Sequence, residues 1–160
     1  MKKIVISFML AAVLITGCAK DNRPSDLPPL YPCAITITQE GSPLSGATVS
    51  LSAMEGTSSK YQPSGITDAN GKATLMTYGF DGAPAGKYKV CVRKTITEDG
   101  GKTLDGYGEE IDAPGMEYRT VEPEYSDAAT TPHEIEIVNK TTPPHSFDVG
   151  KPVKIRRGGS

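Results

Sequence analysis

Short runs of alternating apolar and polar residues constrain the fold of this chain more than any other feature. In residues 34–38, Ile35 and Ile37 share one face and threonines occupy the other, a period of two that predicts a strand with one buried face. The alternation recurs in residues 47–51, 73–78, 87–94 and 134–138, and turn residues separate these runs. No long segment has the period of an amphipathic helix. We therefore expect an all-β sandwich of about seven short strands over residues 33–150.

The acidic stretch from Thr95 to Pro132 interrupts this pattern. A structureless loop of such length is unusual in a compact domain, so short strands are expected at 103–107 and 116–120. Loops on rigid sandwiches often carry binding residues. We therefore expect any binding surface in residues 96–132, where Tyr107, Tyr118 and Tyr125 are the candidate contacts.

The N-terminus has the order of an export signal. Met1-Lys2-Lys3 precedes a nearly apolar run of 12 residues, from Ile4 to Ile15. The run is shorter than the roughly 20 residues of a membrane-spanning helix and matches the h-region of a secretory signal. It leads into Ile15-Thr16-Gly17-Cys18, which resembles the lipobox of bacterial lipoproteins.

This resemblance implies that residues 1–17 are a cleaved signal peptide and that Cys18 is acylated. Acyl chains on Cys18 would anchor the protein in the lipid of the cell membrane or outer membrane, facing the periplasm or the exterior. Residues 18–32 contain four prolines and predict an extended tether, reaching up to about 40 Å. The basic residues 151–160 are expected to form a flexible tail. Cleavage leaves 15 basic against 19 acidic residues, which disfavours binding to nucleic acid.

Three turn-containing stretches give a second resemblance. Residues 41–49, 65–75 and 85–90 carry the patterns Pro-Leu-x-Gly-Ala, Thr-Asp-x-x-Gly and Gly-x-Tyr-x-Val. They resemble the transthyretin-like, or carboxypeptidase regulatory-like, domain. The resemblance covers about residues 33–149 and implies a prealbumin-like sandwich that serves as a docking, accessory or spacer module. The implied partner is an envelope protein or, in an adhesion role, a glycan.

Two relatives of that fold carry chemistry, and this chain departs from both. Hydroxyisourate hydrolases use a histidine and arginine cluster, whereas His133 and His145 stand beside prolines in late loops. Surface-adhesin repeats form an isopeptide from a lysine on the first strand, and residues 34–38 contain no lysine. We therefore expect no catalytic residue, no metal and no cofactor. An enzyme with an unrecognised site in residues 96–132 is the alternative.

Cys33 and Cys91 remain once Cys18 is lipidated. An exported protein permits a disulfide between them, which would stabilise the fold by roughly 4 kcal/mol. However, Cys33 is in phase with core-facing Ile35, whereas Cys91 is in phase with Lys89 on the opposite face of its strand. A bridge therefore needs Cys33 to precede its strand, or a bulge; the alternative is two free thiols.

Four acids, Asp105, Glu109, Glu110 and Asp112, supply the oxygen ligands that calcium prefers. The spacing of a calcium-binding loop is missing, so solvated acids are the expected interpretation.

Overall fold

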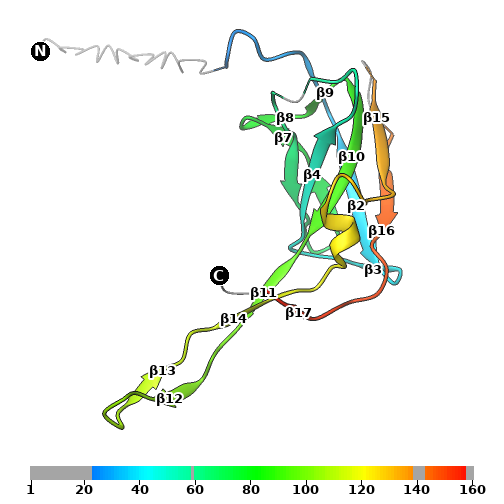
Figure 1. Cartoon of the computed structure of the whole chain (residues 1–160). Helices are drawn as coiled ribbons and strands as arrows, with labels where there is room; N and C mark the ends of the chain where they lie inside the picture. The colour runs from blue at the N-terminus through cyan, green and yellow to red at the C-terminus, as the bar shows by residue number, and fades with distance from the viewer. Residues whose placement is uncertain (1–22, 59, 139–142, 158–160) are drawn as a thin grey trace, which may run out of the picture.

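Within residues 23–58, 60–138 and 143–157, which the computed structural model describes, two β-sheets pack into a sandwich (Figure 1). In these residues the larger sheet has the strand order β15-β10-β4-β5-β7-β8. Its members are β4 (Thr48–Ala53), β5 (Ser64–Ile66), β7 (Met76–Thr77), β8 (Phe80–Asp81), β10 (Gly86–Arg93) and β15 (Glu134–Ile137). The smaller sheet joins β16 (His145–Asp148), β2 (Ala34–Gln39) and β3 (Ser42–Pro43), with β6 (Lys72–Thr74) also paired to β2. The predicted all-β sandwich is confirmed.

The core between the sheets is built from the alternating runs of the sequence. Ile35 and Ile37 of β2, Leu51 of β4 and Val90 of β10 are fully buried in one cluster. Burying each such side chain stabilises the fold by roughly 1.5–3 kcal/mol. Tyr88 of β10 is buried among them, and its hydroxyl donates a hydrogen bond of 3.1 Å to the Pro84 carbonyl. The period of two in the sequence therefore predicts both where these strands lie and which of their side chains are buried.

The segment before the first sandwich strand packs against the body. Leu27 is buried, and β1 (Leu30–Tyr31) pairs antiparallel with β9 (Ala83–Pro84). The Asp26 carboxylate accepts hydrogen bonds from the Lys60 ammonium and the Tyr61 hydroxyl. Residues 18–32 were predicted to be an extended tether, but from residue 23 onward the segment docks on the body, because Leu27 is buried and β1 pairs with β9. Residues 18–22 lie outside the described residues.

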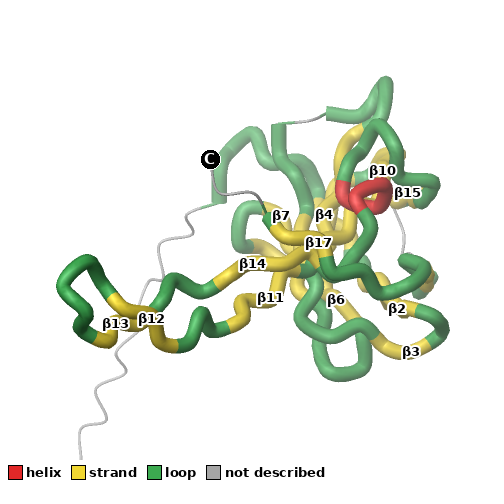
Figure 2. The backbone as a smooth tube through the Cα atoms, turned by 60° about the horizontal axis from the view of Figure 1, so that its bottom comes forward, coloured by secondary structure: helices red, strands yellow, loops and turns green. Residues whose placement is uncertain are grey.

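Residues 95–119 form one long hairpin, which we call the arm. At its base β11 (Thr95–Glu98) pairs with β14 (Met116–Arg119), and further out β12 (Lys102–Leu104) pairs with β13 (Glu110–Asp112). Figures 1 and 2 show the arm projecting away from the sandwich. The strand expected at 116–120 is confirmed as β14, while that expected at 103–107 is displaced to β12 because residues 105–108 make the turn.

The chain end also departs from its prediction. β17 (Ile155–Arg156) adds a third strand beside β14, and the Arg157 amide donates a hydrogen bond of 2.8 Å to the Glu117 carbonyl. The flexible tail predicted for residues 151–160 is thus wrong for residues 155–157, which gain backbone hydrogen bonds from the arm. Residues 158–160 lie outside the described residues.

Residues 121–133, which we call the strap, return from the arm across the outer face of β10. They contain the 3₁₀ helix η1 (Pro123–Ser126). Val121 and Thr131 are buried, and the Thr131 hydroxyl donates a hydrogen bond of 2.9 Å to the Val90 carbonyl. The Lys89 ammonium in turn donates to the Thr131 carbonyl at 3.3 Å. The acidic 96–132 segment therefore divides into a projecting arm and a strap that belongs to the body.

Candidate functional site

The signal peptide predicted for residues 1–17 and the lipidation site Cys18 both lie outside the described residues. Among the residues that the structure describes, no helix is both long and apolar enough to cross a membrane.

The two remaining cysteines are free thiols in this structure. Cys33 belongs to the core cluster between the sheets, whereas Cys91 is buried outside that cluster on the other face of β10, near Arg93 and near Asp127 of the strap. The structure therefore has the two free thiols that were the alternative to a disulfide. Cys33 does precede β2, but its side chain lies between the sheets while that of Cys91 lies on the other side of the larger sheet.

Both thiols have raised pKa values. Burial raises the pKa of Cys33 to about 11. Burial also raises the pKa of Cys91, and the nearby Arg93 guanidinium opposes this shift in part. Because the thiolate is the nucleophile, groups with raised pKa values are poor candidates for covalent chemistry at neutral pH.

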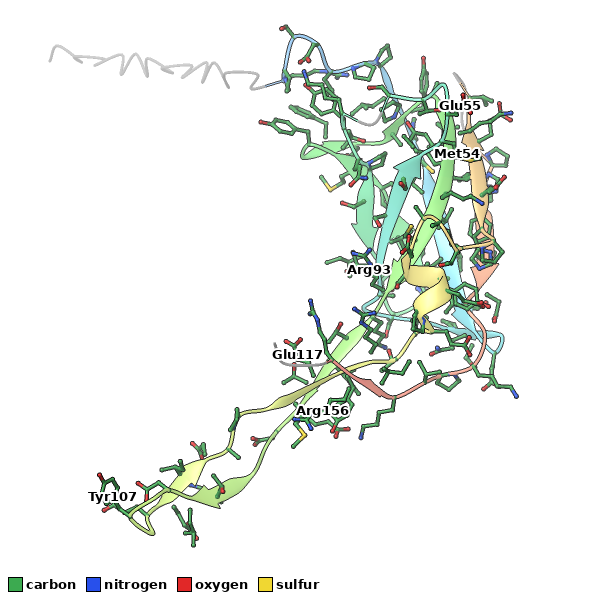
Figure 3. All side chains as sticks on the ribbon, viewed as in Figure 1. Met54, Glu55, Arg93, Tyr107, Glu117 and Arg156 are labelled. Atoms are coloured by element: carbon green, nitrogen blue, oxygen red, sulfur yellow. The ribbon has the colours of Figure 1, made fainter. Side chains whose placement is uncertain are left out.

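The three candidate tyrosines lie in three different environments. Tyr107 is 95% exposed at the tip of the arm (Figure 3). Tyr118 is half-buried at the base of the arm, where the Lys154 ammonium lies 4.5 Å from its ring centroid. Tyr125 of η1 packs against the core and stacks on His133 with ring centroids 5.3 Å apart. The structure therefore does not join them in one surface, and Tyr107 is the one that projects into solvent.

Exposed apolar side chains accompany Tyr107 on the arm. Leu104 of β12 is 64% exposed, and Ile111 of β13 and Met116 of β14 are exposed as well. Thr103 pairs with Ile111 and Leu104 pairs with Glu110, so Leu104 and Ile111 lie on opposite faces of the two-stranded ribbon. Every residue of β12 and β13 is exposed, which means that the body buries neither face. Leu104 and Ile111 were not among the candidates expected from the sequence, because residue type pointed to tyrosines alone.

Local hydrogen bonds shape the tip of the arm. The Asp105 carboxylate accepts the backbone N–H groups of Tyr107 at 2.8 Å and Glu109 at 2.9 Å. These bonds hold the pKa of Asp105 below its usual range. Lys102 and Asp112 form an ion pair of 3.3 Å across the ribbon. Because a two-stranded hairpin is marginally stable by itself, such local contacts are what orders the tip.

The acids of the arm show no metal centre. One oxygen of Asp105 is engaged by backbone amides, and Asp112 pairs with Lys102. Over the described residues, no three His, Cys, Asp or Glu side chains gather in a way that could hold a metal ion.

The arm and the start of the described chain lie at opposite ends of the sandwich. In Figure 1 the segment that begins at residue 23 docks at one end of the two sheets, beside β8 and β9, and the arm leaves the other end. A group attached before residue 23 would therefore approach the body from the end remote from Tyr107.

No protein-family profile matches this chain, and no characterised protein matches its sequence. Among solved structures, a 9R-lipoxygenase from Cyanothece PCC8801 aligns at 18% sequence identity with a TM-score of 0.29. The alignment covers 76% of this chain and 16% of the lipoxygenase chain, so the chain spans about a sixth of that protein's length. Similarity this low assigns neither a fold nor an activity to the chain.

Proposed function

We propose that this protein is a non-catalytic lipoprotein of the bacterial cell envelope, anchored through acylated Cys18, whose prealbumin-like sandwich presents the arm to a partner protein. The observation that carries the proposal is the arm itself. It projects from the sandwich with Leu104, Tyr107 and Ile111 exposed, and the body covers neither face of its outer ribbon. Apolar and aromatic side chains on a protruding element are typical of binding surfaces.

The placement of the arm supports the same role. An anchor before residue 23 would hold the end of the sandwich opposite the arm, so the tip would face away from the lipid of the cell membrane or outer membrane (Figure 1). Burial of the ribbon by a partner would also supply the apolar contacts that the arm lacks in the free protein.

Glycan binding is the second candidate, and the exposure of Tyr107 is the observation that favours it. An exposed aromatic ring offers a flat apolar face for stacking against a ligand. In this alternative Tyr107 carries most of the affinity, whereas a protein partner would also need Leu104 and Ile111. An enzyme with its site in residues 96–132 has less support, because the last third of that segment, residues 121–132, packs as the strap.

Crosslinking in native membranes tests the proposal. A photo-crosslinking residue placed at Tyr107 of the full chain is expected to capture one envelope protein, identified by mass spectrometry. The same residue placed at Lys72, an exposed position on β6, should not capture it. Equal capture from both positions, or capture of no protein from position 107, would contradict docking through the arm.

Two matched substitutions separate the candidates. Leu104→Ser is expected to abolish capture of a protein partner, because it removes apolar area from the ribbon. Ile66→Ser is the control, since Ile66 on β5 is 69% exposed and lies on the body. Glycan adducts that depend on Tyr107 and survive Leu104→Ser would favour the adhesion alternative.

A further inference from the structure

A pocket lies in the angle between the base of the arm and the strap. Its volume is about 330 Å³, enough for a small group of a few heavy atoms with its water. The walls come from the end of β10, the start of β11, β14, the strap and the residue after β17. Its lining residues are Arg93, Lys94, Thr95, Arg119, Val121, Ser126, Asp127 and Arg157.

The lining is strongly cationic. Its lining residues include four cations, Arg93, Lys94, Arg119 and Arg157, and one acid, Asp127. The whole chain, by contrast, has a formal net charge of −2. These cations come from distant points of the sequence and are assembled by pairing of the arm strands with β17. Gathering like charges costs free energy unless an anion offsets it.

Strand register puts two of the arginines on one face of the arm. Arg119 is opposite Thr95 on β11 and opposite Ile155 on β17. Because side chains alternate, Arg157 lies on the same face as Ile155, and Arg156 lies on the other face with Tyr118. Figure 3 shows Glu117 and Arg156 on opposite sides of the arm, and Arg93 where β10 meets its base.

Two of the cations are held in place and two keep their donors free. Arg93 donates from Nε at 3.0 Å and from Nη2 at 2.8 Å to the Ser126 carbonyl, which fixes it against the strap. Arg157 pairs with Glu117 at 3.2 Å. Within the described part of the chain, the side chains of Lys94 and Arg119 have no hydrogen bond or ion pair. The pocket therefore combines fixed guanidinium groups with unused donors.

We infer that this pocket binds a tetrahedral oxyanion, a phosphate or sulfate group, with Arg119 as its principal ligand and the guanidinium groups of Arg93 and Arg157 beside it. A dianion would neutralise most of the excess charge of the lining, and its several oxygens suit donors that converge from different strands. Guanidinium groups bind such oxygens with paired, charge-assisted hydrogen bonds. Binding here goes beyond the proposed docking function and does not depend on it.

Thermal unfolding of the full chain with inorganic phosphate tests the site. At constant ionic strength, phosphate is expected to raise Tm as its concentration increases, because it binds the folded state, while chloride does not. Arg119→Gln is expected to weaken the apparent affinity about tenfold or more. Arg156→Gln is the matched control, since it removes the same charge from the opposite face of the same sheet and should leave the affinity unchanged. Arg119→Lys keeps the charge but loses the paired donors, and it provides a second variant should Arg119→Gln fold poorly.

Three outcomes would overturn the inference. They are equal Tm shifts with chloride and phosphate, equal losses in Arg119→Gln and Arg156→Gln, or association of two copies that requires Arg119 and leaves phosphate without effect. The last result would mean that the pocket receives the acidic arm of a second copy. A chain in which Asn-Gly replaces residues 99–115 distinguishes this site from the proposed function, because it keeps the whole lining. That variant should no longer co-purify with the partner identified by crosslinking, and it should keep the phosphate effect.

Discussion

The body and the arm are built from the same kind of strand but are stabilised differently. In β10 of the body, Tyr88, Val90 and Val92 are fully buried, and cross-strand neighbours continue the core on both sides. In β12 and β13 of the arm, backbone pairing is complete while no side chain is buried. Burial therefore fixes the body, whereas local hydrogen bonds and turn residues shape the arm. The difference implies that changes in the arm affect binding with little effect on folding.

The largest expected contrast compares one substitution in the two regions. Leu51→Ala in β4 removes a fully buried side chain and is expected to destabilise the fold by about 2–5 kcal/mol. Leu104→Ala in β12 should change the free energy of unfolding by less than about 0.5 kcal/mol, since that side chain is already in solvent. Urea unfolding of both variants measures this difference. Similar losses would show that the arm is part of the cooperative core.

The strap and the arm come from the same acidic segment, but only the strap has buried side chains, so matched substitutions in the two can be compared for their effect on stability. Thr131→Val removes the hydroxyl that donates to Val90 in a buried position, so a loss of about 1–3 kcal/mol is expected. Thr103→Val on exposed β12 makes the same chemical change and should be nearly neutral. An unchanged free energy of unfolding in Thr131→Val would mean that the strap, like the arm, contributes little to the stability of the fold.

Two aspartates with lowered pKa values predict different pH responses. Asp148 accepts hydrogen bonds from the Gly41 amide and the Thr38 hydroxyl, which tie β16 to β2 and hold its pKa below the usual range. Its contribution to stability is present above the unfolded-state pKa of about 3.9 and is lost as the pH falls through the lower folded value. Asp148→Asn should therefore flatten the acid limb of the stability curve.

Asp105 is the counterpart in the arm. Its pKa is lowered by the amides of Glu109 and Tyr107, but these bonds join residues of a single turn. Asp105→Asn should leave global unfolding almost unchanged and increase hydrogen exchange at the Tyr107 amide. An equal effect of the two substitutions on global stability would contradict the separation of arm and body.

Shortening the arm is also expected to have a small effect on stability, although it removes many more residues than a substitution does. Glu98 and Met116 are directly paired, so Asn-Gly can replace residues 99–115 as a two-residue hairpin turn. The free energy of unfolding should change by less than about 1 kcal/mol, because no buried side chain is removed. Circular dichroism with urea unfolding checks the fold. A large loss would mean that the outer ribbon stabilises the sandwich.

Sequence patterns predicted the parts of the fold that burial determines. Alternation in residues 34–38, 87–94 and 134–138 identified β2, β10 and β15 and the faces that they bury. The phase of Cys91 relative to Val90 also indicated that the two cysteines face different ways. The outer ribbon, β12 and β13, has no alternation of apolar and polar residues, because neither of its faces is buried. Its strand pairing could therefore not be predicted from hydrophobic periodicity.

Tertiary contacts determine the remaining features. The burial of Val121 and Thr131 depends on the strap crossing β10, and the pairing of Ile155 depends on the free edge of β14. Local composition indicated loops and a basic tail at these positions. For the candidate site, residue type selected three tyrosines, but exposure depends on position in the fold and leaves Tyr107 alone at the tip.

Because residues 23–32 dock on the sandwich, only residues 18–22 would be left to link a lipidated Cys18 to the folded body. Five residues span at most about 18 Å between Cys18 and Arg23. The body of the proposed lipoprotein would therefore stay close to the bilayer surface, and the tip of the arm would be confined to a small volume. A partner in the same layer would meet the tip at a high effective concentration, so modest affinity per contact would suffice for stable association.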